Sequence, residues 1–126
     1  MTVVDSSGWL EYLAAGPNAD FFAPALEDPA RLVVPAISVY EVFRRVLSQR
    51  GEDAALRAAA LMSRGQVIPL SAGTALAAAR LGVAHRLPLA DSIFLATARE
   101  HGADLWTQDD AFEGLPGVRF VPARRG

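Results

Sequence analysis

LPLADSIFLATAREHGADLWTQDDAF, residues 87–112, is the stretch whose pattern is most informative about the fold. Residues 89–102 carry apolar side chains at helical spacing and end in Gly102, a residue type that often follows the last turn of a helix. The next run, ADLWT at residues 103–107, is short and apolar, as is typical of a buried strand. A helix that leads into a buried strand favours a protein built around a parallel sheet.

The same alternation of strand and helix runs through the rest of the chain. It predicts an α/β protein with a three-layer α/β/α arrangement, in which helices cover both faces of a mainly parallel central sheet of four to five strands. At this length, residues 1–126 are expected to form a single domain. The predicted strands are residues 2–5, 31–35, 66–70, 103–107 and 118–122, and the predicted helices are residues 6–15, 19–28, 37–51, 52–65, 71–86 and 89–102.

The composition indicates a folded globular protein and excludes several chemistries. Hydrophobic residues make up 52 % of the 126 positions and charged residues 21 %, which is typical of chains that bury a core. No cysteine is present, which excludes disulfides and thiolate metal sites. All twelve basic residues are arginines, and the absence of lysine argues against P-loops, receiver domains and dehalogenase-type phosphatases.

The charge and the hydropathy pattern bear on partners and location. The net charge is −2, so any binding of nucleic acid would depend on a local basic patch. The first residues show no signal-peptide pattern, and no apolar run approaches the roughly 18 residues of a membrane span. We therefore expect a cytoplasmic protein with no membrane association.

Acidic residues stand at positions that a parallel sheet would bring together. Asp5 ends the first predicted strand, and Asp109 and Asp110 follow the fourth. Parallel strands end at a common edge, where such proteins bind ligands. Asp91 begins a helix that precedes a strand, so it reaches this edge only if a helix pair makes the crossover. Residues 86–88 divide two helical stretches there, which indicates such a pair.

Each acid also has an ordinary structural explanation. Glu41 lies within the apolar run SVYEVF and could form an exposed ion pair with Arg45 one turn later. Asp5 and Asp91 could cap the helices that follow them, and Asp109 could be a turn residue. As a set, four carboxylates in one place would repel one another unless a divalent cation offset their charge. Oxygen ligands without cysteine or histidine suit Mg²⁺ or Mn²⁺.

Three segments together resemble the PIN-domain nucleases, and most closely the VapC-type toxins of bacterial toxin–antitoxin pairs. They are VVDSSGWLEYL at residues 3–13, ISVYEVFRRVL at residues 37–47, and residues 87–112, and the resemblance extends from Val3 to about Val121. It implies a PIN-like fold and a metal-dependent endoribonuclease that hydrolyses RNA phosphodiester bonds. The alternative is a non-catalytic PIN-type module that binds RNA or protein.

The resemblance also assigns roles by position. It implies that Mg²⁺, or Mn²⁺ as a substitute, is held by Asp5, Asp91 and Asp109, and that Glu41 acts mainly through water as a proton acceptor. The family pattern takes the acid two residues after Thr107, which selects Asp109 and leaves Asp110 as a possible substitute. The implied catalytic acids are Asp5, Glu41, Asp91 and Asp109, and the implied supporting hydroxyls are those of Ser6 and Thr107.

Partners follow from the same resemblance. It implies an RNA substrate, a cognate VapB-type antitoxin and a homodimer, for which the apolar segments 19–26 and 54–62 are candidate interfaces. Basic residues near Glu41 and Asp91 in sequence are candidates for RNA phosphate contacts, although a solvated helix face would show the same pattern. These candidates are Arg44, Arg45, Arg80, His85 and Arg86.

Overall fold

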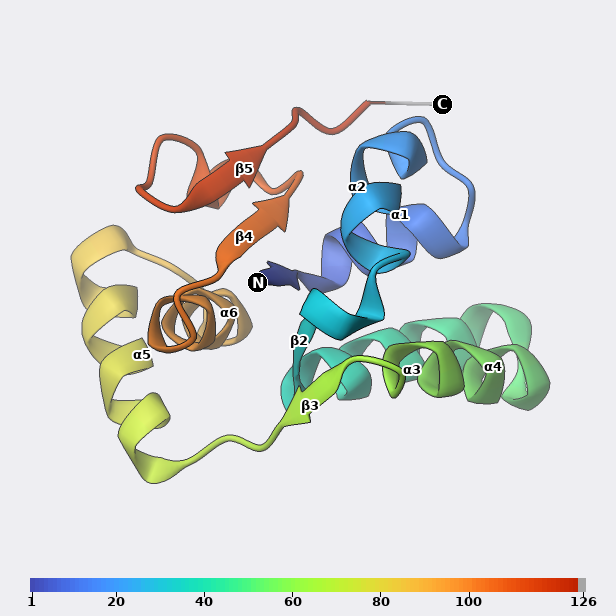
Figure 1. The fold of residues 1–126 in the computed structure, drawn as a ribbon, viewed down its shortest axis with the longest axis horizontal. Helices are drawn as coiled ribbons and strands as arrows, with labels where there is room; N and C mark the ends of the chain where they lie inside the picture. Colours follow the sequence, from blue (N-terminus) through green and yellow to red (C-terminus); the bar gives the residue numbers. More distant parts are fainter. Residues whose placement is uncertain (125–126) are drawn as a thin grey trace.

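The computed structural model describes residues 1–124 and is organised around five parallel strands (Figure 1). Hydrogen bonds join β1, β4 and β5 in that order, and join β2 to β3. A parallel bridge between Thr2 and Leu32 connects the two groups, so the strands follow the order β3-β2-β1-β4-β5. The predicted parallel sheet of four to five strands is confirmed. The strands are β1 (Thr2–Val4), β2 (Val33–Pro35), β3 (Gln66–Ile68), β4 (Asp104–Thr107) and β5 (Val118–Phe120).

Every predicted helix is present. The helix that contains Pro24 continues through it, and Gly51 and Gly102 adopt positive φ angles of 89° and 60° just after the helices that precede them. A short 3₁₀ turn at Pro29–Arg31 was not predicted, and a second one occupies Asp110–Phe112. The helices are α1 (Ser6–Leu13), α2 (Ala19–Leu26), α3 (Ala36–Arg50), α4 (Glu52–Met62), α5 (Ala72–His85) and α6 (Leu89–Glu100).

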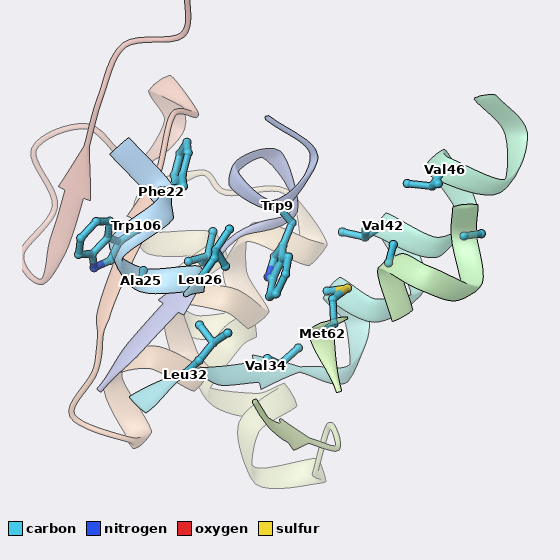
Figure 2. Close-up of a cluster of buried hydrophobic side chains, with 13 residues drawn as sticks. Trp9, Phe22, Ala25, Leu26, Leu32, Val34, Val42, Val46, Met62 and Trp106 are labelled. Atoms are coloured by element: carbon cyan, nitrogen blue, oxygen red, sulfur yellow. The ribbon is translucent and has the colours of Figure 1, made fainter. Parts of the chain in front are cut away.

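The inner strands β1, β2 and β4 are covered on both faces, which produces the three layers, whereas the edge strands β3 and β5 are partly exposed. On one face, Val4, Val34 and Trp106 pack with side chains of α1, α2, α3 and α4 (Figure 2). On the other face, Val33 and Leu105 pack with apolar residues of α6. Neighbouring strand residues point to opposite faces, and here both faces are apolar. This is the continuous apolar pattern expected of strands covered on both sides.

A helix pair, α5 and α6, makes the connection from β3 to β4 (Figure 1). The chain reverses at Arg86, which has a left-handed conformation with φ 56°. The two helices approach closely, because a Cβ on Gly82 would lie 2.7 Å from the Ser92 hydroxyl. Thr74 of α5 also donates a 2.8 Å hydrogen bond to Glu100 of α6. The predicted pair is confirmed, and it returns the first turn of α6 to the edge where the strands end.

The exposure of two parts of the surface differs from what their apolar sequence suggests. Tyr40 lies within the apolar run SVYEVF, but it is 60 % exposed. The segments 19–26 and 54–62 were candidate interfaces, but most of their apolar residues belong to the core, including Phe22 and Met62. The largest exposed apolar side chains of α5 and α6 are instead Leu76, Val83 and Leu89.

The length and composition of the helices show whether any of them could span a membrane. Within residues 1–124, no helix combines the length and the apolar composition that crossing a bilayer requires.

Candidate active site

Four carboxylates from four separate elements line one pocket of about 550 Å³ at the carboxyl edge of the strands. Asp5 directly follows β1, and Asp109 lies two residues beyond β4. Glu41 comes from the second turn of α3, and Asp91 comes from the first turn of α6. The structure therefore brings together the four acids that the sequence pattern selected.

Asp5 is the most deeply buried acid, with 1 % of its surface exposed. It is the N-cap residue of α1 and accepts a 2.9 Å hydrogen bond from the Gly8 backbone N–H. The Ser7 hydroxyl lies 2.9 and 3.0 Å from its two oxygens. The capping explanation is thus correct for Asp5, and the same carboxylate also lines the pocket. Its hydrogen bonds hold it in one orientation, as a fixed ligand requires.

Thr107 links two of the acids. Its hydroxyl donates a 2.6 Å hydrogen bond to Asp5 and accepts a 2.9 Å hydrogen bond from the Asp109 N–H. Asp109 also accepts a 3.0 Å hydrogen bond from the Ala111 N–H, so it caps the short 3₁₀ turn while it lines the pocket. Asp110 is exposed and does not line the pocket. Geometry therefore favours Asp109 over Asp110.

Glu41 is oriented by a serine and not by an arginine. The Ser6 hydroxyl donates a 2.7 Å hydrogen bond to a Glu41 carboxylate oxygen. The proposed ion pair with Arg45 is not formed, since within residues 1–124 the one ion pair shorter than 4.0 Å joins Arg119 to Asp104. The sequence explanation of Glu41 as half of a surface ion pair is therefore wrong, and its link to the residue after Asp5 ties α3 to the pocket.

Asp91 does not cap its helix. Pro88 occupies the N-cap position of α6 without a side-chain hydrogen bond. Among the hydrogen bonds of residues 1–124, none runs from a backbone N–H to the Asp91 carboxylate, which lies half-buried against the pocket. The explanation that Asp91 caps α6 through a side-chain hydrogen bond is therefore wrong. Its position in the first turn still places it in the favourable end of the helix dipole.

Burial and mutual repulsion raise the pKa of two of the acids. Burial raises the pKa of Asp5 from 3.8 to about 6, against the opposing effect of hydrogen bonds from Thr107, Gly8 and Ser7. The pKa of Asp91 rises from 3.8 to about 7. Burial is the largest cause, and the negative charges of Asp109 and Asp5 raise this pKa further. The ionised pocket is therefore electrostatically costly, and a bound cation would lower that cost.

The donor set fits a hard divalent cation. The pocket presents four carboxylates and no histidine or cysteine, which matches the oxygen ligands preferred by Mg²⁺ and Mn²⁺. The raised pKa values of Asp5 and Asp91 are what crowded carboxylates show without a counter-charge. Within residues 1–124, however, no group of three or more His, Cys, Asp or Glu side chains is already arranged to hold an ion. The four carboxylates thus fit a divalent cation by the chemistry of their oxygen donors.

Only part of the predicted basic set reaches the pocket. Arg44 and Arg45 of α3 line it, whereas Arg80, His85 and Arg86 are exposed and do not. Several other lining residues could not be predicted from the sequence, because helical periodicity does not tell which face of a helix borders a pocket. These residues are Ser7, Leu10, Tyr40, Ser48 and Phe94.

A second pocket of about 650 Å³ adjoins the first. The two share Ser7, Leu10 and Arg45, and the second continues between α1, α3 and α4. Its lining mixes apolar side chains with the exposed arginines Arg50 and Arg57. The acids thus lie at one end of a longer depression with a partly basic wall.

A PIN-domain family model matches residues 2–118, which is most of the chain. The chain therefore belongs to the PIN-domain family. A comparison with curated protein sequences gives no match.

Solved structures are similar over nearly their whole length. A toxin–antitoxin complex from Klebsiella pneumoniae is 26 % identical, with a TM-score of 0.80 over 94 % of this chain and 96 % of that chain. The sarcin–ricin-loop-cleaving toxin VapC20 of Mycobacterium tuberculosis is 21 % identical, with a TM-score of 0.76 over 99 % of this chain and 100 % of its own. VapBC2 of Rickettsia felis, bound to a promoter DNA fragment, is 14 % identical, with a TM-score of 0.72 over 96 % and 97 % of the two chains. The last two similarities show the fold alone.

Proposed function

We propose that this chain is an Mg²⁺- or Mn²⁺-dependent endoribonuclease and the toxin of a VapBC-type toxin–antitoxin pair. The observation that carries the proposal is the convergence of Asp5, Glu41, Asp91 and Asp109, from four separate elements, on one pocket. Membership of the PIN-domain family and the similarity to toxin–antitoxin structures support it. In this proposal residues 1–126 act as one domain, in the cytoplasm, where RNA substrates are present.

Asp5, Asp91 and Asp109 are the residues that would hold the cation. When bound, the cation supplies a Lewis acid that makes water a better nucleophile and offsets charge on the phosphodiester. The hydrogen bonds from Thr107 and Ser7 keep the Asp5 oxygens from rotating, and the Thr107 hydroxyl sets the position of the Asp109 backbone. These contacts reduce the reorganisation that substrate binding would otherwise require.

Glu41 is the proposed proton acceptor for the attacking water. Its carboxylate lines the pocket, and one of its oxygens accepts the Ser6 hydrogen bond while the second has no hydrogen-bond partner among residues 1–124. A free, oriented carboxylate oxygen is what proton transfer from water needs. We propose that Arg44 and Arg45, which line the same pocket, bind the phosphates that flank the scissile bond.

We propose that an antitoxin neutralises the site by covering the pocket. An antitoxin arginine could contact two of the four carboxylates in a bidentate manner and so compete with the cation. We also propose a homodimer, formed through the exposed apolar residues Leu76 and Val83 of α5 and Leu89 of α6, which are 62 %, 85 % and 76 % exposed. Burying these side chains in a dimer interface would remove apolar surface from water.

Cleavage of a structured RNA tests the catalytic part. We expect products with Mg²⁺ or Mn²⁺, none with EDTA, and near-complete loss of cleavage in Asp5→Asn and Asp91→Asn. Asp20→Asn, an exposed acid of α2 outside the pocket, serves as the matched control and should cleave normally. RNA binding without cleavage under every metal condition would refute the nuclease and support the non-catalytic module.

Growth experiments test the biological part. Expression of the chain should slow growth, the Asp5→Asn variant should not, and co-expression with the product of an adjacent small DNA-binding-protein gene should restore growth. A well-folded, abundant protein without any effect on growth would contradict the toxin assignment.

A further inference from the structure

Tyr40 is the one exposed aromatic side chain of the protein. The chain has ten aromatic residues, all within the described part, and the other nine are buried or partly buried. Tyr40 is 60 % exposed, yet it borders the pocket that holds the four acids. An aromatic ring left in water beside a candidate active site contributes little to the core, so its position requires another explanation.

The surroundings of Tyr40 are polar and basic. Arg44, one turn later on α3, donates a 3.1 Å hydrogen bond from its guanidinium to the Tyr40 hydroxyl. Arg45 and Ser48 line the same pocket, and Glu41 follows Tyr40 directly. The Tyr40 ring, the Arg44 guanidinium that contacts its hydroxyl, and Glu41 therefore all come from α3 and line the pocket together.

This combination matches the chemistry of single-stranded RNA. Unpaired bases stack on exposed aromatic side chains, and neighbouring arginines bind the backbone phosphates. A continuous duplex would keep its bases stacked inside the helix and leave the ring without a partner. The positive charges of Arg44 and Arg45 complement a phosphate backbone, whereas an apolar partner surface would leave both guanidinium groups unpaired.

We infer that Tyr40 is the platform on which an unpaired RNA base next to the scissile phosphate stacks, while Arg44, held by the Tyr40 hydroxyl, contacts the adjoining phosphate. The inference rests on the proposed function and assigns to Tyr40 a positioning role within that site. Tyr40 then determines where the strand sits, and stacking, which every base can provide, leaves sequence discrimination to other contacts.

Binding of a short fluorescein-labelled single-stranded RNA to the Asp5→Asn protein tests the inference without cleavage. Tyr40→Ala should weaken binding roughly five- to 150-fold, the range expected for loss of one base–aromatic stack. Tyr40→Trp should retain affinity, because the indole ring also stacks. Tyr40→Phe should lose less than Tyr40→Ala, since it keeps the ring and loses only the contact with Arg44. Tyr12→Phe removes a comparable hydroxyl contact, to Glu27 on another surface, and should bind normally.

Salt dependence separates the stacking role from the phosphate role. Arg44→Ala should lower the slope of log affinity against log salt by roughly one, because one phosphate contact is lost. Tyr40→Ala and Tyr40→Phe both lack the hydroxyl that contacts Arg44, so the two variants should have equal slopes, and Tyr40→Ala should bind more weakly than Tyr40→Phe at every salt concentration. Equal affinity of these two variants would overturn the stacking assignment.

Fluorescence and an abasic RNA locate the base. Both native tryptophans are buried, so Tyr40→Trp adds a single exposed indole whose emission RNA should quench. Leu56→Trp places an indole at a 52 % exposed position of α4 outside the pocket, and RNA should leave that indole unquenched. Removing the base at one position next to the cleavage site should weaken binding to the parent protein but not to Tyr40→Ala.

The outcomes also distinguish this inference from the proposed function. Normal RNA affinity and normal cleavage in Tyr40→Ala would overturn the inference and leave the nuclease assignment intact. Weakened neutralisation by the antitoxin with unchanged RNA affinity would overturn it in favour of a protein contact. Failure of the parent protein to bind or cleave any RNA would overturn both.

Discussion

Replacing Asp91 with asparagine should stabilise the metal-free protein at alkaline pH. The change keeps the shape of the side chain and removes its charge, and it disturbs no backbone cap because Pro88 holds the N-cap position. Burial and then the charges of Asp109 and Asp5 raise the pKa of Asp91 from 3.8 to about 7. A carboxyl group whose pKa is higher in the folded than in the unfolded protein destabilises the fold when it ionises.

The sign and the size of the expected stability change follow from the raised pKa of Asp91. Below pH 3.8 the group is protonated in both states and contributes nothing; the cost grows between pH 3.8 and about 7 and is complete above that range. A rise of this size would cost a fully buried carboxylate about 4 kcal/mol. Asp91 is only half-buried and solvent screens its charge, so we expect a cost of about 1–2 kcal/mol.

Thermal melts with EDTA measure this cost. At about pH 8, Asp91→Asn should melt roughly 3–8 °C above the parent protein, and the difference should shrink at about pH 5. Mn²⁺ should stabilise the parent by about 2.7 kcal/mol at a hundredfold excess over its Kd, and Asp91→Asn should lose most of this gain. Asp20→Asn, which lies outside the pocket, should follow the parent under each condition.

Two results would refute the reasoning. Equal melting temperatures of parent and Asp91→Asn at both pH values would show that Asp91 carries no electrostatic cost. An equal Mn²⁺ shift in the two proteins would show that Asp91 does not contribute to cation binding.

Three further predictions concern the support of the site. Thr107→Val should destabilise the protein by about 1–3 kcal/mol in denaturant melts, because it leaves the Asp109 N–H and an Asp5 oxygen without this partner; a loss below the error of the melt would contradict this. The same variant should move the acidic limb of the pH–rate profile to higher pH, because the Thr107 hydrogen bond lowers the pKa of Asp5. Gly8→Ala should cost about 1–3 kcal/mol, because its Cβ would lie 2.6 Å from Val4 Cγ1. Gly73→Ala, where the nearest atom is 3.8 Å away, should be neutral or stabilising, and equal losses in both glycine variants would rule out the packing argument.

The order of strands and helices could be predicted because it depends on local patterns. Short apolar runs, helical spacing and glycines such as Gly51 and Gly102 mark elements and their ends without reference to the rest of the chain. The parallel sheet then follows from the alternation, and it explains why Asp5 and Asp109 meet: parallel strands end at the same edge.

The tertiary structure alone decided how each side chain near the site is used. Asp109 lines the pocket and its neighbour Asp110 does not, because the chain turns between them and the Thr107 hydroxyl holds the Asp109 backbone. Arg86 lies close to Asp91 in sequence but does not line the pocket. Residues that are neighbours in sequence share a strand end or a helix turn, but the packing of the elements decides which of their side chains line the same pocket.

The amino-acid sequence by itself was enough to predict the α/β class and the helix pair before β4. It was also enough to select the four acids as candidates for one site. The tertiary structure decided that Asp91 is not a cap, that Glu41 pairs with Ser6, and that Tyr40 lies exposed on the pocket rim. The physical reason is that periodicity records which residues are apolar, whereas burial, pKa and hydrogen bonding depend on which distant element covers a side chain. Tyr40 of α3 lies within the apolar run SVYEVF, yet packing leaves its ring in solvent beside the acids.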